Sequence, residues 1–439
     1  MEQRVRVAVW TMAALGAAAL LAAGCKSNDA ASGPGAGAPG SIITVTGKIL
    51  GQNNLGVAGV PVFVTGKPST NSDASGNFTF TNVTVPYDVT VVNAATKAAL
   101  IYKALSRSDP TLTFIGLTAG TTRGATCNGK ISGGAFLPNQ PVDHLTRVVY
   151  ASPEASAGTT TGADGTFGST VNWNGPSTTT GAIYALQYQA AAGLPVAAGY
   201  KGYGVKNGVV LTDGNPLINQ FDTLQTIATA QLTGAVTVAA GYSVYDKILN
   251  MRLSGTAAME VFSDPTTTGT LSYYTPSITG ITLIFGVAAR VGGPGTSQSI
   301  MFRPGLAPNA SGVAITLPAS PEPSLPIAGA TGIDTAVTFS WTSFTGGMHL
   351  VVFAGGVGDP SYYVFTSGTS TTIPNLQPFG LGLPSNKAYT WQVYGFAPFA
   401  NSDAAAGQAG FLGPLTNVAA LTGDAYIAIS AKRAFTTKP

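Results

Sequence analysis

The amino-acid sequence predicts an all-β protein built from tandem β-sandwich domains. Charged residues make up 9% of the 439 residues, against about 25% in an ordinary globular protein. Long soluble helices need Glu, Lys and Arg on their outer faces, so few are expected. The 56 glycines and 28 prolines favour tight turns, and the abundant Thr, Ser and Val suit half-buried strands. The length predicts roughly two to four domains.

Residues 1–24 predict a secretory signal peptide. A basic start precedes an apolar stretch, 7–23, which is expected to form the signal helix, and a small-residue cleavage site follows it. The sequence Leu-Ala-Ala-Gly-Cys ending at Cys25 resembles the lipobox of bacterial lipoproteins, with Ala22 where that family usually has Leu. The resemblance implies that the signal is cut before Cys25 and that this cysteine carries the lipid, palmitate among its acyl chains.

Residues 25–41 are rich in Gly, Ala, Ser and Pro, which predicts a flexible tether between the lipid and the first domain. Lys26 follows the cysteine, in place of the Asp that retains enterobacterial lipoproteins in the inner membrane. We therefore expect a bacterial cell-envelope protein, with the outer membrane favoured over the inner. No later stretch reaches the ~18 apolar residues of a membrane span, so lipid alone is expected to provide the membrane contact.

Residues 42–118 predict the first sandwich. Apolar and polar residues largely alternate over 43–50, the pattern of a half-buried strand. The segments Val57-Ala-Gly-Val-Pro-Val62, Asp73-Ala-Ser-Gly-Asn-Phe78 and Pro86-Tyr87 follow in that order. This arrangement resembles the carboxypeptidase regulatory-like domain, which implies a transthyretin-like sandwich without the catalytic domain of those enzymes.

Two further β units are predicted between residues 119 and 317. In 119–232, Cys127-Asn-Gly-Lys-Ile-Ser132 and Asp164-Gly-Thr-Phe167 resemble motifs of the first unit, so we expect a second transthyretin-like sandwich. Strand patterns continue through 233–317 and predict a third unit. The sequence leaves open whether 119–317 is one domain or two.

The last unit, 318–439, begins with a Pro-rich segment that is predicted to be a linker. The order of Trp341, Leu376 and Tyr389 in successive strand patterns is similar to that of a fibronectin type III or related immunoglobulin-like domain. The resemblance implies that the Tyr389 hydroxyl binds a nearby backbone group, as in a tyrosine corner. The segment 398–421 is longer than the last hairpin of that family.

No catalytic or metal-binding constellation is recognisable. The two histidines, His144 and His349, lack the His-x-x-Glu or His-Glu-x-x-His spacing of zinc enzymes and are expected to be surface or strand residues. Four aspartates have Gly, Pro or Ser nearby and are expected to stabilise turns: Asp73, Asp164, Asp213 and Asp264. We expect no enzymatic activity, cofactor or metal; a hydrolase with scattered acids remains the enzyme hypothesis.

The charge and the cysteines exclude two further classes. A formal net charge of +3 without clustered Lys and Arg excludes an electrostatic nucleic-acid surface. If Cys25 is acylated, Cys127 has no partner for an internal disulfide. Cys127 is expected to be a buried small residue, with an intermolecular disulfide as the alternative.

Aromatic residues suggest a binding surface. Trp173 lies between two asparagines at a polar strand end and is a candidate platform for stacking on a sugar ring. The pairs Tyr273-Tyr274 and Tyr362-Tyr363 place one ring on each face of a strand. The alternative for all of these aromatics is ordinary packing.

The predicted function is that of a non-enzymatic, lipid-anchored envelope protein. Its sandwiches are expected to extend in series as spacers and to bind glycans or other envelope proteins. The alternative is a carbohydrate-binding accessory lipoprotein that serves polysaccharide degradation.

Overall fold

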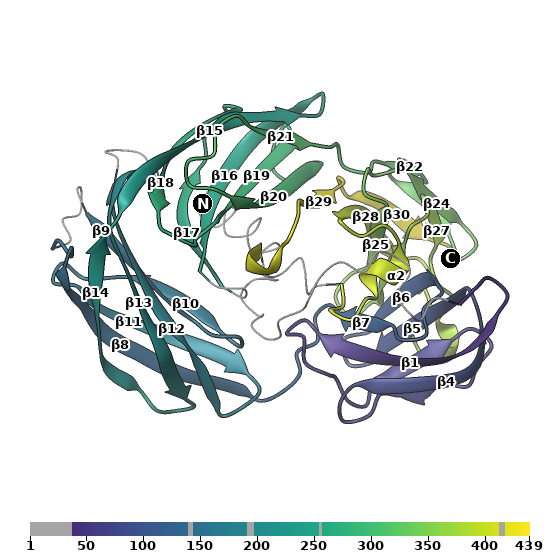
Figure 1. Ribbon diagram of the computed structural model, residues 1–439. Coiled ribbons are helices and arrows are strands. Elements are labelled where there is room, and N and C mark those ends of the chain that lie inside the picture. Colours follow the sequence, from purple (N-terminus) through teal and green to yellow (C-terminus); the bar gives the residue numbers. More distant parts are fainter. Residues whose placement is uncertain (1–36, 139–143, 191–196, 254–256, 412–417) are drawn as a thin grey trace.

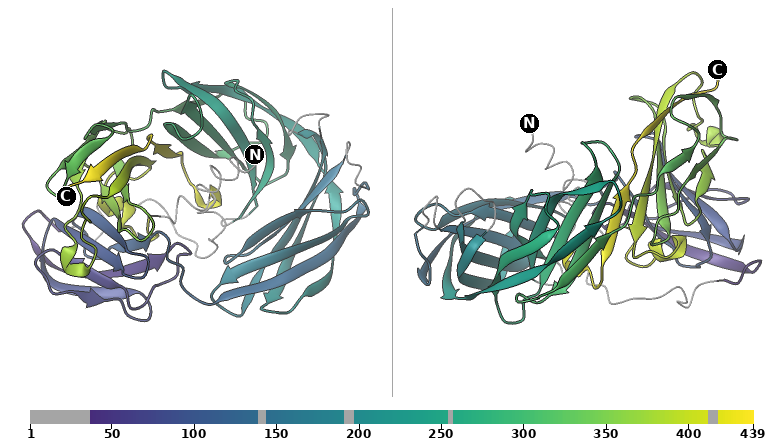
Figure 2. Two further views of the ribbon diagram at one scale, coloured as in Figure 1. Left: turned by 180° about the vertical axis from the view of Figure 1, so that it is seen from behind. Right: turned by 90° about the horizontal axis from the view of Figure 1, so that it is seen from above.

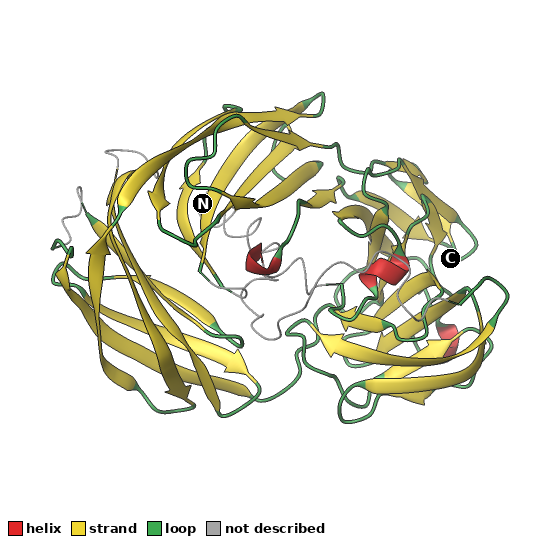
Figure 3. Ribbon diagram, viewed as in Figure 1, coloured by secondary structure: helices red, strands yellow, loops and turns green. Residues whose placement is uncertain are grey.

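The computed structural model describes residues 37–138, 144–190, 197–253, 257–411 and 418–439. The predicted signal peptide, Cys25 and most of the predicted tether lie outside these ranges. Within them the protein is all-β, as predicted: Figure 3 shows strands throughout and only short helical segments. None of the helices in the described ranges is long and apolar enough to cross a membrane.

The first unit is a sandwich of two sheets. One sheet has the order β4-β1-β7, and the other face is formed by β3-β2-β5-β6. Alternation in β1 turns Val45 and Ile49 into the core, where they pack with apolar residues of the opposite sheet such as Val91 and Leu100. The strands are β1 (Ile42–Gly51), β2 (Pro61–Val64), β3 (Thr70–Asn71), β4 (Asn77–Thr84), β5 (Tyr87–Asn93), β6 (Ala98–Leu105) and β7 (Thr111–Phe114).

The second unit is a single curled sheet in the order β10-β9-β12-β13-β14-β8-β11. Its two edge strands, β10 and β11, come into contact with each other, so the sheet nearly closes around a core of its own. The strands are β8 (Thr122–Gly134), β9 (Leu145–Ala151), β10 (Ser156–Thr160), β11 (Thr166–Asn174), β12 (Thr178–Ala190), β13 (Ala197–Thr212) and β14 (Leu217–Thr226).

The third unit packs the sheet β18-β15-β21 against the strands β17-β16-β19-β20. Its core also contains Val149, Tyr184 and Leu186, which come from the back of the second unit's β9 and β12. Residues 119–317 therefore have two cores that share one layer. The strands are β15 (Ala228–Val238), β16 (Tyr242–Arg252), β17 (Ala258–Asp264), β18 (Thr270–Ser277), β19 (Leu283–Val291), β20 (Gln298–Leu306) and β21 (Val313–Leu317).

The fourth unit faces the sheet β22-β24-β27 with β30, β28, β25 and β26. The prediction that the Pro-rich segment at the start of this unit is a linker is wrong in part. The segment contains β22 and β23, so it belongs to this sandwich. The elements are β22 (Pro323–Leu325), β23 (Ala330–Ile333), β24 (Thr338–Trp341), β25 (Met348–Ala354), β26 (Ser361–Thr366), β27 (Ser370–Thr372), η1 (Gln377–Phe379), β28 (Ala388–Ala397), α2 (Ser402–Ala405), η2 (Val418–Ala420), β29 (Ala425–Ile429) and β30 (Arg433–Thr437).

One sheet runs through three of the four units, in the order β17-β16-β19-β20-β29-β28-β25-β26-β6-β5-β2-β3. At one junction β26 pairs in parallel with β6 of the first unit, and at the other β29 joins β28 to β20. The expectation of domains in series is therefore wrong. The first and fourth units lie side by side, as both views of Figure 2 show, and the chain follows an open ring (Figure 1).

The long segment 398–421 ties the units together. The Asp403 carboxylate accepts hydrogen bonds from the backbone N–H groups of Ser106 (2.8 Å) and Arg107 (3.2 Å) in the first unit. On the other side, Arg252 of β16 donates to the carbonyl oxygen of Leu421. The described parts of this segment, residues 398–411 and 418–421, thus form hydrogen bonds to the first unit and to the third.

Candidate functional site

The strongest candidate site is the outer face of β8 and β11. These strands are antiparallel neighbours in which Thr126 lies opposite Thr170. On either side of this row, Asn172 lies opposite Gly124 and Asn128 lies opposite Gly168. We call these six residues the Asn–Thr face.

The two glycines make room for the asparagine side chains. A Cβ atom added at Gly124 would lie 2.8 Å from Oδ1 of Asn172, and one added at Gly168 would lie 2.7 Å from Oδ1 of Asn128. Real Cβ atoms do not approach that closely, so each carboxamide lies across the glycine of the opposite strand. The face consequently presents amide and hydroxyl groups to solvent.

The Asn–Thr face carries no net charge at either end. Beyond Gly124, Arg123 forms an ion pair with Asp213 at 2.8 Å. Beyond Asn128, Lys130 lies 3.5 Å from the Asp164 carboxylate. Both cations next to the face are therefore neutralised by adjacent acids.

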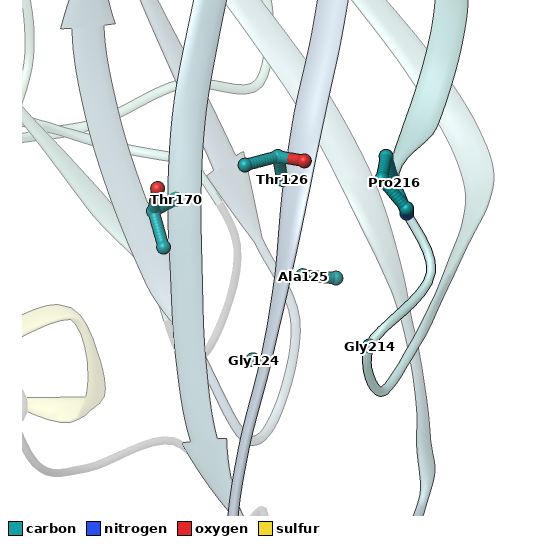
Figure 4. Close-up of a pocket in the computed structure, with 6 residues that line it drawn as sticks. All are labelled: Gly124, Ala125, Thr126, Thr170, Gly214 and Pro216. Atoms are coloured by element: carbon teal, nitrogen blue, oxygen red, sulfur yellow. The ribbon is translucent and has the colours of Figure 1, made fainter.

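A shallow groove of about 200 Å³ runs along this face beside the turn between β13 and β14. Figure 4 shows Thr126 and Thr170 on the two neighbouring strands, with Gly214 and Pro216 on the turn. The turn is held in place because the N–H of Gly214 donates to the carbonyl oxygen of Gly124 at 2.9 Å. Pro216 thus gives the groove a fixed apolar wall.

Trp173 is not an exposed platform, so that prediction is wrong. Its side chain is 2% exposed, and its Nε1–H donates to the carbonyl oxygen of Pro176 at 2.8 Å. Strand alternation explains the error: Val171 and Trp173 point into the core, and Asn172 between them points outward. The polar surroundings of Trp173 in the sequence belong to the opposite face of the strand.

Cys127 lies on the core side of β8, beneath the Asn–Thr face. It is 1% exposed, which confirms the expectation of a buried residue. Burial raises the pKa of its thiol to about 11, so the reactive thiolate is scarce at neutral pH.

The tyrosine pairs divide between the two faces of their strands, as expected. Tyr273 is buried and Tyr274 is 49% exposed; Tyr362 is buried and Tyr363 half-buried. The Tyr389 hydroxyl donates to the backbone carbonyl oxygen of Pro360 at 3.0 Å, which confirms the expected backbone contact.

The histidines and aspartates take several structural roles. His349 lies in β25, as a strand residue, but it is buried against Trp341, and this burial lowers its pKa to about 4. Asp73, Asp164 and Asp264 each accept a hydrogen bond from the backbone N–H group two residues further on, which confirms the turn prediction for these three. Among the described ranges no group of three or more His, Cys, Asp or Glu residues could hold a metal ion.

Asp264 forms a buried ion pair that the sequence did not predict. Its carboxylate lies 3.0 Å from Nζ of Lys247, whose side chain is 0% exposed. The Tyr273 hydroxyl donates to the same carboxylate at 2.6 Å, and Lys247 also donates to Thr266. Burial disfavours the ionised acid, but the hydrogen bonds from Tyr273, Thr266 and Lys247 outweigh it and hold the pKa of Asp264 below its ordinary value.

A second hollow, of about 420 Å³, lies at the end of the fourth unit. Its polar lining includes Asn375, Gln377 and the pair Asp334–Lys438, whose charged atoms are 3.8 Å apart. Its opposite charges already pair with each other, and the Asn375 Oδ1 atom accepts a hydrogen bond from the N–H of Gln377 at 3.3 Å.

No known protein family and no curated protein matches the chain. Among solved structures, it is similar to the Bacillus anthracis TIE protein, with 10% identity over 64% of this chain and 51% of that one, and a TM-score of 0.16. It is also similar to shaft pilin SpaA from Lactobacillus rhamnosus GG (10% identity, 46% and 98% coverage, TM-score 0.16). Two B repeat units of the Staphylococcus aureus collagen-binding protein give 11% identity, 80% and 92% coverage and a TM-score of 0.13.

Proposed function

We propose that this protein is a lipid-anchored scaffold of the bacterial cell envelope that presents a binding surface and has no enzymatic activity. The observation that supports the scaffold role is the sheet shared by the first, third and fourth units. Strand pairing across both junctions fixes these units relative to one another, whereas flexibly linked domains move independently.

The anchor and the scaffold are close together in this proposal. Residues 37 and 40 already donate backbone hydrogen bonds to the first unit, at Ser106 and Val85. The predicted tether therefore shortens to residues 26–36, which span at most ~40 Å when fully extended. A lipid on Cys25 would hold the scaffold within this distance of the bilayer, with the outer membrane as the favoured location.

Two finer assignments belong to the same proposal. The first unit is a carboxypeptidase regulatory-like domain, supported by the facing sheets β4-β1-β7 and β3-β2-β5-β6. The fourth is a fibronectin type III-like domain, supported by its facing sheets and the backbone hydrogen bond of Tyr389.

Replacing the anchoring cysteine tests the proposal. Cells that express the wild type are expected to incorporate labelled palmitate into the protein and to retain it in the membrane fraction. Cys25→Ser should abolish the label and release the protein, because no other thiol near the amino end can be acylated. The matched control is Cys127→Ala, which removes the buried thiol and should leave labelling unchanged. Equal labelling of the Cys25→Ser variant would contradict the lipid anchor.

A second candidate function is that of a carbohydrate-binding accessory protein that serves polysaccharide degradation. It is favoured by the Asn–Thr face, because amide and hydroxyl groups form hydrogen bonds with sugar hydroxyls without needing charge.

A further inference from the structure

We infer that the Asn–Thr face binds a neutral polysaccharide laid along β8 and β11. This inference deepens the second candidate function by naming the site and the ligand class, and it does not depend on the lipid anchor.

The first argument is the supply of unused hydrogen-bonding groups. Asn172 and Thr170 are exposed, and Asn128 and Thr126 are half-buried. Within the described chain neither carboxamide has a hydrogen-bond partner, although other surface amides do, such as Gln231, which donates to Ser272 at 3.2 Å. Each carboxamide offers two donors and an acceptor, so the face can both donate to and accept from a ligand hydroxyl.

The second argument is their regular spacing. Asn172, the pair Thr170–Thr126, and Asn128 occupy alternate positions along the two strands. Successive groups are therefore ~6.6 Å apart, and the two asparagines are ~13 Å apart. A repeating polymer presents the same hydroxyl groups at regular intervals, so one extended chain can contact all three rows.

The third argument is charge. The only charged side chains adjoining the face along β8 are Arg123 and Lys130, and each is paired with an aspartate. Along β8 and β11 an anionic polysaccharide would therefore find both of these cations already paired with an acid. The apolar edge of Pro216 beside the groove can contact the C–H face of a sugar ring.

Binding is tested with the purified full-length protein by affinity electrophoresis. The gels contain one neutral polymer each: an uncharged cellulose derivative, xylan, galactomannan or starch. Polygalacturonate serves as the anionic comparison. At least one neutral polymer is expected to retard the protein, and polygalacturonate is not. The variant Asn128→Ala/Asn172→Ala should weaken this retardation at least tenfold in apparent Kd, because it removes both carboxamides. Gly168→Val should also weaken it, since its side chain would displace Asn128.

The matched control is Gln231→Ala/Ser272→Ala, which removes an exposed polar pair from the outer face of β15 and β18. It should bind as the wild type does, and thermal unfolding should show that all variants are folded. The inference is overturned if no neutral polymer binds, if only polygalacturonate binds, or if the double asparagine variant binds like the wild type. These results are independent of the palmitate experiment, so failure of the anchor and failure of this site can be told apart.

Discussion

Lys247→Met is expected to lower the free energy of unfolding by about 3–5 kcal/mol. The substitution keeps most of the apolar side chain but removes the charged group that lies 3.0 Å from Asp264. The carboxylate would remain buried with hydrogen bonds from Tyr273 and Thr266 only. An ionised acid in that setting lacks its compensating charge, and its desolvation then counts fully against the folded state.

Urea denaturation followed by tryptophan fluorescence and circular dichroism measures this loss. The matched control is Lys103→Met, because Lys103 also pairs with an aspartate, Asp88, at 2.7 Å, but both side chains are about one-third exposed. An exposed pair contributes ~1 kcal/mol or less. Equal effects of the two substitutions would show that the Lys247–Asp264 pair is not buried as described.

Phe365→Ala is expected to lower the free energy of unfolding by about 3–5 kcal/mol. It should also weaken the junction between the first unit and the fourth. Phe365 is fully buried in β26, and its ring stacks on Tyr102 of β6 with 4.5 Å between ring centroids. Its ring also packs against that of Phe411 in the long segment, with 4.6 Å between ring centroids. Removing the ring leaves a cavity where three separate parts of the chain meet.

Hydrogen exchange measured by mass spectrometry tests directly whether the junction between the first and fourth units weakens. Residues 98–105 and 361–366 should both exchange faster in Phe365→Ala, because they form the two sides of one strand junction. The control Tyr274→Ala removes an exposed aromatic ring and should change stability by ~0.5 kcal/mol or less. Faster exchange of 361–366 alone would contradict the shared junction.

Local features of the fold were predictable from the sequence because they depend on nearby residues. The Asp73–Asn77 turn and the alternation in β1 are set within a few positions, and the structure contains both. The junction between β6 and β26 joins residues more than 250 positions apart. Neither strand carries a local signal for its partner, since both are simply apolar segments that can pair with several edges.

The sequence predicted Trp173 in β11 as the candidate platform, but this residue faces the core. Trp173 drew attention to β11, but the side chains available to a ligand are its neighbours, Asn172 and Thr170. Strict alternation from Val171 would have indicated this. The matching residues on β8 could not be inferred, because the register between β8 and β11 is not encoded near either strand. The Lys247–Asp264 pair could not be predicted for the same reason, because it depends on the register between β16 and β17.

The most direct test of the shared sheet is an engineered disulfide across its central junction. Ala98 and Ser361 are register partners in the parallel pair β6–β26, and paired strands lie ~4.8 Å apart, within disulfide reach. In a Cys25→Ser/Cys127→Ala background, Ala98→Cys/Ser361→Cys should oxidise to a single internal crosslink, seen by peptide mapping. The mis-registered pair Ala98→Cys/Tyr363→Cys places the two Cα atoms ~8 Å apart and should not. Absence of the first crosslink, or equal formation of both, would contradict a single sheet that joins the first unit to the fourth.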